Sequence, residues 1–133
     1  MDNQSSVKFS HAIKVLPTDI DELGHVNNVV YLRWVQEVAV AHWQYAASAL
    51  LKETYLWVVI RHEIDYYQPS FLDDNIIGYT WVGEHRGAKF DRYVRICKAD
   101  NNKIVAEAKT TWCLLDAKTM RPKRIEQDVL AIL

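Results

Sequence analysis

The sequence predicts an α+β protein in which a curved antiparallel sheet of five strands wraps around one long central helix. The observations behind this prediction are one long helical pattern over residues 29–52, strand patterns on either side of it, and short turns between the later strands. Short turns imply antiparallel pairing, and the apolar face of such a sheet needs a cover that only this helix can supply. A chain of 133 residues suits one domain, which we expect over residues 1–133.

The first part of the chain predicts a strand, a loop and the helix. Apolar residues alternate over 7–15, which is typical of a strand. Residues 16–28 are rich in Pro, Asp, Gly and Asn and indicate a loop, with Asn27 or Asn28 as the cap of the helix. The helix over 29–52 carries only a narrow polar stripe, so we expect protein around most of its circumference.

Four further strands are expected after the helix, over 55–68, 75–86, 90–98 and 103–115. Alternation predicts that the first of them has one apolar face, formed by Leu56, Val58, Ile60, Ile64 and Tyr66. The same alternation places Phe90, Val94 and Ile96 on the inner face of the third. The tail over 125–133 indicates a short helix or an irregular segment.

Composition and charge exclude several classes of protein. Sixteen basic and seventeen acidic residues give a net charge of −1, which offers no field for nucleic acid or for an anionic membrane surface. No apolar run approaches the roughly 20 residues that a membrane-spanning helix needs, and the polar N-terminus lacks the apolar segment of a signal peptide. We therefore expect a cytoplasmic protein without membrane or nucleic-acid partners.

The motifs present do not indicate metal or cofactor chemistry. The five histidines have no metal-ligand spacing, and Cys97 and Cys113 form neither a C-x-x-C pair nor a zinc pattern. We predict that both thiols are buried and unpaired in a reducing compartment. The phosphate-loop and serine-nucleophile motifs are absent from the sequence. The sequence thus predicts no metal site and no cofactor.

The segment before the helix carries the residues best suited to chemistry. It reads Asp19-Ile-Asp21-Glu-Leu-Gly24-His25-Val-Asn27-Asn28. The start of a helix offers free backbone N–H groups and a partial positive charge, which can polarise a carbonyl oxygen. A nearby carboxylate could attack that carbonyl, or deprotonate a water that does so, which suits acyl transfer. The structural alternative is that Asp19 and Asp21 shape the turn while Asn28 caps the helix.

Two sequence blocks resemble a known family. The first starts at Asp19 and reads D-I-D-E-L-G-H-V-N-N-V-V-Y-L-R-W, and the second starts at Glu63 and reads E-I-D-Y-Y-Q-P-S-F-L-D-D. Both are similar to blocks of the hotdog-fold thioesterases, in particular of the 4-hydroxybenzoyl-CoA thioesterase-like acyl-CoA thioesterases. The resemblance covers about residues 7–115, and its H-V-N-N segment is also shared with plant acyl-carrier-protein thioesterases.

The resemblance implies roles for three residues. Asp21 matches the family's catalytic carboxylate and would be the nucleophile or the general base. Asn28 falls where the family's helix-start amide polarises the thioester carbonyl through its backbone N–H. His25 matches a histidine of the plant-type branch and could orient water or stabilise charge, or it could be a loop histidine bonded to the backbone. Leu23 stands where the plant enzymes have a catalytic asparagine, so their full mechanism is not implied.

The resemblance also implies partners for the chain. The family's sites form between two subunits, so we expect a homodimer, or a tetramer built from it. Coenzyme A is part of the substrate, and no separate cofactor is implied. Arg86 and Lys89 match the region that contacts the CoA phosphates, where basic side chains are expected. The alternative for these two residues is a solvated hairpin tip.

The function that these residues predict is hydrolysis of an acyl-CoA thioester by Asp21. Two alternatives remain open, namely a hydratase or dehydratase acting on an acyl thioester, and a non-catalytic module that binds acyl-CoA. Hydration would consume a conjugated double bond without releasing thiol, whereas a binding module would show affinity without turnover. The many aromatic residues suit an aromatic or a medium-chain acyl group equally.

Overall fold

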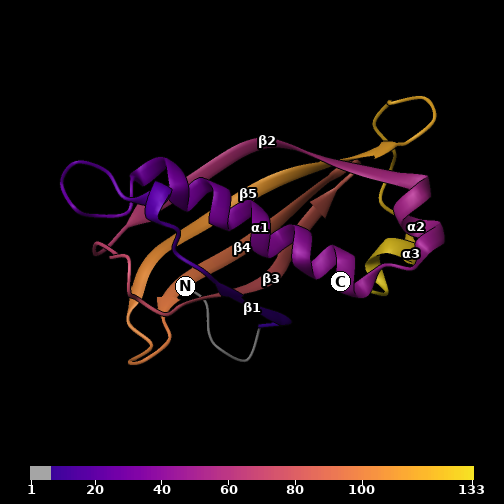
Figure 1. Cartoon of the computed structure of the whole chain (residues 1–133). Helices are drawn as coiled ribbons and strands as arrows, with labels where there is room; N and C mark the ends of the chain where they lie inside the picture. The colour runs from indigo at the N-terminus through magenta and orange to yellow at the C-terminus, as the bar shows by residue number, and fades with distance from the viewer. Residues whose placement is uncertain (1–6) are drawn as a thin grey trace.

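A five-stranded antiparallel sheet and one long helix dominate the computed structural model, which describes residues 7–133 (Figure 1). The strands lie side by side in the order β1-β3-β4-β5-β2. The elements are β1 (Phe9–Ile13), η2 (Pro17–Asp19), α1 (Asn28–Ala46), α2 (Ala49–Thr54), β2 (Tyr55–Tyr66), β3 (Ile76–Arg86), β4 (Lys89–Lys98), β5 (Ile104–Asp116) and α3 (Gln127–Leu130). The predicted α+β fold with its five antiparallel strands and central helix is confirmed.

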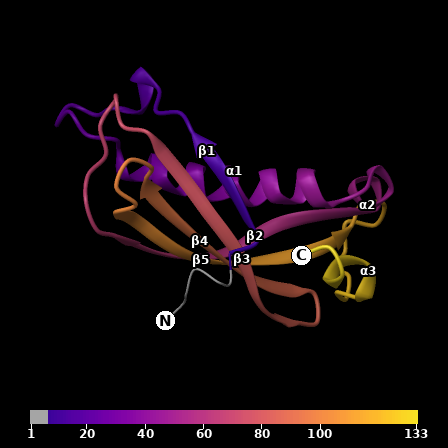
Figure 2. The same cartoon turned by 90° about the horizontal axis from the view of Figure 1, so that it is seen from below.

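Helix α1 lies along one face of the curved sheet (Figure 2). Trp34, Val35 and Val38 project from it into the main core and are at most 1% exposed. Ala106 and Ala108 of β5 are buried in the same cluster, where their small side chains make room for the helix. No helix among residues 7–133 is long and apolar enough to cross a membrane.

The helical segment is shorter than predicted, because it breaks after Ala46. Ala47 has an extended backbone, with φ −83° and ψ 141°, and α1 therefore ends there. Ser48 begins the separate helix α2 as its N-cap, since its side chain accepts a hydrogen bond from the backbone N–H of Leu51. The prediction of one helix over 29–52 was wrong because Ser48 acts as a cap and not as a member of the polar stripe.

The prediction that five apolar residues of β2 share one face was also wrong, because the strand contains an irregularity. Its register with β5 shifts between Val59 and Arg61, which places the residues on either side of the shift out of phase. Before the shift, Trp57 packs in the second core cluster, while Leu56, Val58 and Ile60 are 39%, 39% and 50% exposed. After the shift, Ile64 packs against the main core as predicted.

The prediction for β4 is confirmed, since Phe90, Val94 and Ile96 are all buried. Both cysteines, Cys97 and Cys113, are buried and unpaired, as expected. The short helix α3 matches one of the two alternatives for the C-terminal tail.

Gly78 of β3 sits directly beneath α1, and this contact predicts a stability effect. A Cβ atom at this position would overlap a methyl group of Val38, a fully buried side chain that is stiff because it is β-branched. We expect Gly78→Ala to lower the free energy of unfolding by about 2 kcal/mol through overpacking, as measured by urea denaturation. Adding Val38→Ala should cost less in that variant than in the wild type, because it removes the overlapping methyl. Additive costs would contradict this explanation.

Candidate active site

The loop before α1 is closed by backbone hydrogen bonds. Ile20 and Val26 form an isolated antiparallel bridge, and the Asp21 N–H donates to the His25 carbonyl at 2.8 Å. Gly24, with φ +81°, makes the turn between them and donates its N–H to the Asp21 carbonyl at 3.0 Å. The loop thus holds Asp21 and His25 next to each other, just before the helix.

Asp19 anchors this loop to the helix. It is 1% exposed, and one oxygen of its carboxylate accepts the Leu16 N–H at 2.9 Å. The other oxygen lies 2.9 Å from a guanidinium nitrogen of Arg33, whose pKa this hydrogen bond raises. The Asp19 carbonyl also accepts the Asn27 N–H at 2.9 Å. Of the two aspartates in the sequence block, Asp19 therefore has the structural role that was the alternative for both.

The carboxylate of Asp21 is held in place and remains partly exposed. Its Oδ1 accepts the backbone N–H of Leu23 at 2.9 Å, which limits the rotation of the side chain. Within residues 7–133, its Oδ2 accepts no hydrogen bond. Leu23 is 75% exposed, so the loop presents an apolar side chain beside this carboxylate.

The start of α1 leaves one amide available. Asn27, and not Asn28, is the N-cap, because its Oδ1 accepts the Val29 N–H at 3.0 Å. The Asn28 N–H donates to no group in the described part of the chain. Free amides and the aligned peptide dipoles of this 19-residue helix favour negative charge at this end. An oxyanion forming here would be stabilised.

His25 faces a second loop. Its ring lies edge-on to the ring of Phe71, with centroids 5.4 Å apart. The next residue, Val26, donates its N–H to the Ser70 carbonyl at 2.9 Å, which joins the two loops. The block from Glu63 to Asp74, which carried the resemblance together with the first, therefore packs against the first in space.

Arg86 and Lys89 lie at the hairpin between β3 and β4 and far from Asp21 of the same chain. Strand β3 begins after the Ser70 loop and runs from Ile76 to Arg86, a span of about 33 Å at roughly 3.3 Å per residue. Arg86 forms a two-pronged ion pair with Asp91 at 3.0 and 3.3 Å. Lys89 is exposed and forms no ion pair with any residue in 7–133. One chain alone therefore does not bring these cations to the carboxylate.

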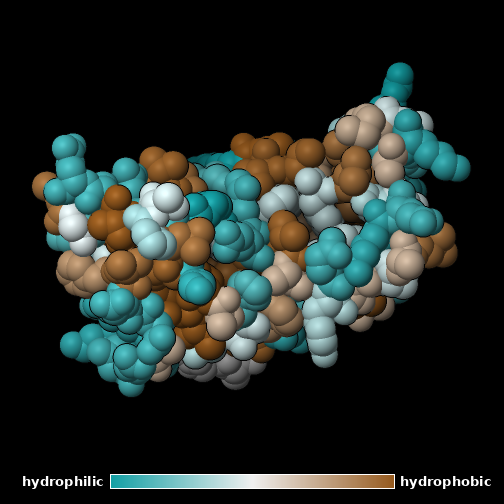
Figure 3. All heavy atoms as spheres, viewed as in Figure 1, coloured by the Kyte–Doolittle hydropathy of each residue, from teal (hydrophilic) through white to brown (hydrophobic). Residues whose placement is uncertain are grey.

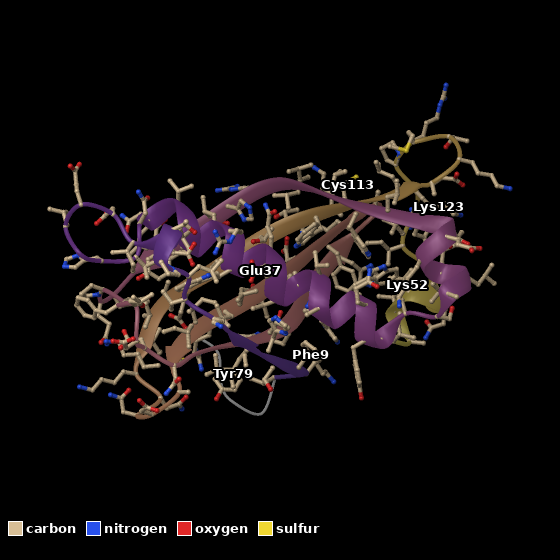
Figure 4. All side chains as sticks on the ribbon, viewed as in Figure 1. Phe9, Glu37, Lys52, Tyr79, Cys113 and Lys123 are labelled. Carbon is tan, nitrogen blue, oxygen red and sulfur yellow. The ribbon has the colours of Figure 1, made fainter. Side chains whose placement is uncertain are left out.

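A cavity of about 220 Å³ lies at the opposite end of α1 from Asp21. Figure 4 shows Lys52, one of its lining residues, beside α2 and α3 and away from the loop before α1. The walls are mainly aromatic and aliphatic, and the side chains include Trp43, Tyr55, Trp57, Val82, Phe90 and Trp112. Such a mixture of apolar walls and a few polar groups is typical of small-molecule sites.

Arg92 lies in the wall of this cavity and was missed by the sequence analysis. Its Nη1 lies 3.0 Å from both the His42 Nδ1 and the Thr80 Oγ1, and its side chain is buried under α1. Burial, with the charges of Arg92 and Lys8, lowers the pKa of His42 to about 4, so this ring is neutral and accepts the hydrogen bond. The signal was available, because Arg92 shares its parity with Phe90 and Val94, which were predicted to point inward.

His62 forms a second polar contact under α1. Its Nδ1 lies 2.8 Å from the Thr110 Oγ1, and its Nε2 lies 3.2 Å from the Gln36 Nε2. Burial lowers its pKa, which favours the neutral ring. No group of three or more His, Cys, Asp or Glu side chains that could hold a metal ion occurs in residues 7–133.

The fold and the loop define a class of protein, and comparisons agree with it. The family model of the thioesterase-like superfamily matches residues 15–133. The chain is 25% identical over 126 residues to an acyl-CoA thioester hydrolase, YbgC, of Escherichia coli O6:H1, covering 92% of this chain and 93% of that protein. This chain therefore belongs to the thioesterase-like superfamily, and the expectation of a thioesterase-family enzyme is confirmed at that level.

Solved structures place the fold within the same group. A 1,4-dihydroxy-2-naphthoyl-CoA thioesterase from Synechocystis superposes with a TM-score of 0.81 at 16% identity, covering 93% of both chains. A thioesterase from Thermus thermophilus, complexed with coenzyme A and Zn, superposes with a TM-score of 0.80 at 22% identity, covering 95% of this chain and 90% of that one. The fold is the hotdog fold of these thioesterases.

Proposed function

We propose that this protein is an acyl-CoA thioesterase that hydrolyses a thioester to a free acid and CoA. The observation that carries the proposal is the position of Asp21, a partly exposed carboxylate on a hydrogen-bonded loop just before the start of α1. The helix start supplies the amide of Asn28, which has no partner among residues 7–133. A carboxylate and an amide that can face one carbonyl are what acyl transfer to water requires.

Two routes use these groups in the same way. Asp21 either attacks the thioester carbonyl, forming an anhydride that water then hydrolyses, or removes a proton from the water that attacks. In both routes the carbonyl oxygen becomes negative and is stabilised by the Asn28 N–H and the helix dipole. The C–S bond then breaks and the thiolate takes up a proton. His25, held beside Asp21 by the loop, orients the water or stabilises charge. No cofactor is needed, because water is the only co-reactant.

The active unit in this proposal is a homodimer formed along β2, with a tetramer as a larger assembly. β2 is an edge strand whose one neighbour among the described strands is β5. Leu56, Val58 and Ile60 are exposed along it, and Figure 3 shows hydrophobic atoms gathered at the border of the molecule over this strand. A two-fold antiparallel pairing of β2 with its copy would extend the sheet across both protomers.

Such pairing would also complete the site. It would bring the Tyr55 end of one β2 strand, which borders the cavity, beside the Tyr66 end of the partner strand. The Tyr66 hydroxyl donates to the Asn28 carbonyl at 3.3 Å, so that end lies at the start of α1. One protomer would then supply the carboxylate and the amide, and its partner would supply the cavity. Arg86 and Lys89, whose hairpin lies toward the cavity end of the sheet, would bind the CoA phosphates.

The test is release of free thiol from a panel of short, long, branched and aromatic acyl-CoA esters. We expect release from at least one ester, with equal amounts of acid and CoA. A reagent control without substrate accounts for Cys97 and Cys113, which are buried. Loss of crotonyl-CoA conjugation without thiol would indicate a hydratase, and calorimetric binding without turnover would indicate a binding module. Either result would contradict the proposal.

A further inference from the structure

The cavity at the end of α1 contains a positive charge that lacks a counterion. Arg92 is 6% exposed, and within residues 7–133 no carboxylate lies within ion-pair distance of its guanidinium. Asp91 also borders the cavity, but its carboxylate binds Arg86 and the Thr111 hydroxyl and forms no ion pair with Arg92. Both partners of Arg92, His42 and Thr80, are uncharged. Burying a guanidinium in this way is costly unless an anion accompanies it.

Other donors line the same cavity without acceptors. The Nε and Nη2 groups of Arg92 have no hydrogen-bond partner in the described part of the chain, because both of its bonds use Nη1. The indole Nε1 of Trp112 is buried and likewise unpaired there. Trp112 pairs with Phe90 in the sheet, so it is a diagonal neighbour of Arg92 on the inner face, within the reach of one bound group.

The remaining walls suit an apolar body. Trp43, Trp57 and Phe90 form a row of ring contacts along one side, with centroids 5.6 and 6.3 Å apart. Lys52 is a further cation in the lining. An occupant that satisfies all of these groups has an aromatic or aliphatic body and an anionic oxygen group at one end. A carboxylate fits best, because its two oxygens match the two free donor groups of a guanidinium.

We propose that this cavity receives the acyl group of the substrate and that Arg92, with Trp112, binds a carboxylate at its far end. The preferred substrates are then thioesters of dicarboxylic acids, with one carboxyl esterified to CoA and the other bound by Arg92. The substrate class rests on the proposed thioesterase function, since it specifies the acyl group that is hydrolysed. The carboxylate site itself can be tested without any turnover.

The binding test uses isothermal titration calorimetry on the Asp21→Asn protein, so that no hydrolysis interferes. The probes are phenylacetate and phenylacetamide, which have the same shape and differ in charge. We expect phenylacetate to bind at least about tenfold more tightly than the amide, as a site built for one polar group discriminates against its neutral analogue. Equal affinities, or no binding of either probe, would overturn the carboxylate site.

Variants of Arg92 test the residue itself. Arg92→Met should reduce the affinity for phenylacetate to that for the amide, whereas Arg92→Lys, which keeps the charge, should retain part of the preference. Arg124→Met is the matched control, because Arg124 is exposed and forms no ion pair in residues 7–133, and it should bind as the unchanged protein does. Retained preference in folded Arg92→Met would overturn the assignment. If Arg92→Met does not fold, the test is made with Arg92→Lys, and an undiminished preference for phenylacetate in that variant would overturn the assignment.

Turnover then separates this inference from the proposed function. In the protein that retains Asp21, kcat/KM for adipoyl-CoA should exceed by about tenfold that for the neutral thioester in which the free carboxyl is a methyl ester. Arg92→Met should abolish this difference and should still hydrolyse the neutral thioester. Hydrolysis of both CoA thioesters at equal rates would overturn the carboxylate preference and leave the thioesterase function intact. Binding of phenylacetate without hydrolysis of any thioester would overturn the thioesterase function and leave the carboxylate site intact.

Discussion

Asp21→Asn is expected to lower kcat for acyl-CoA hydrolysis by at least about a hundredfold, because general acid–base and nucleophilic roles contribute on this scale. Asparagine keeps the size of the side chain and can still accept the Leu23 N–H through its amide oxygen. The loop geometry and the free energy of unfolding should therefore change little. The measurement is steady-state thiol release, with circular dichroism and thermal unfolding as checks on the fold.

Glu22→Gln provides the matched control for this prediction. Glu22 is the neighbouring acid of the same loop, is exposed, and forms no ion pair in residues 7–133. Its substitution removes the same charge from the loop and should leave kcat within about twofold of the wild type, as expected for a surface change. If Asp21→Asn hydrolyses at the wild-type rate, or if both variants lose activity equally, the carboxylate of Asp21 is not the catalytic group.

The second large effect concerns stability at acid pH. The pKa of His42 is lowered to about 4 by burial and by the nearby charges of Arg92 and Lys8. In the unfolded chain this imidazole has a pKa of about 6.5. Below that pH, His42 is protonated in the unfolded state and remains neutral in the folded state until about pH 4. The free energy of unfolding therefore falls as the pH falls. Between about pH 7 and pH 4 the loss should be about 3 kcal/mol.

His42→Gln tests this assignment, because glutamine does not titrate and its oxygen can accept the hydrogen bond from Arg92. Urea denaturation at several pH values should give a flatter profile for this variant between about pH 6.5 and pH 4. His62, whose pKa is also lowered by burial, contributes with the same sign in both proteins. The control for the substitution itself is His85→Gln, which replaces an exposed histidine by the same residue. Identical slopes for the wild type and His42→Gln would refute the prediction.

Most of the fold could be predicted because its signals are local. Alternation in β4, the apolar circumference of α1 and the cap residues beside Asn28 depend only on neighbours along the chain. The errors arose where two local signals compete. Ser48 is both polar enough for a helix stripe and a good N-cap, and the structure uses it as the cap. The irregularity after Val59 could not be recognised from the residues of β2 alone, because it is a shift in the register between β2 and β5.

The candidate site divides in the same way. The sequence determined the loop, its glycine turn and the helix start, because hydrogen bonds over a few residues hold Asp21 and His25 there. Spacing alone left Asp19 and Asp21 equivalent, and only the family resemblance favoured Asp21. The contact with Arg33 from α1 then gave Asp19 its structural role. The sequence did not predict the cavity, because its walls come from α1, α2, the strands β2 to β5 and Leu133.

The sequence by itself determined the order of the five strands and the long helix, the family resemblance and the loop before α1, since each depends on residues that are close together along the chain. The tertiary structure decided the inner face of β2, the role of Asp19 and the burial of Arg92 beside His42. The physical reason is that burial and charge compensation depend on which distant segments meet. A charged residue such as Arg92 has no assignable role until the groups that surround it are known.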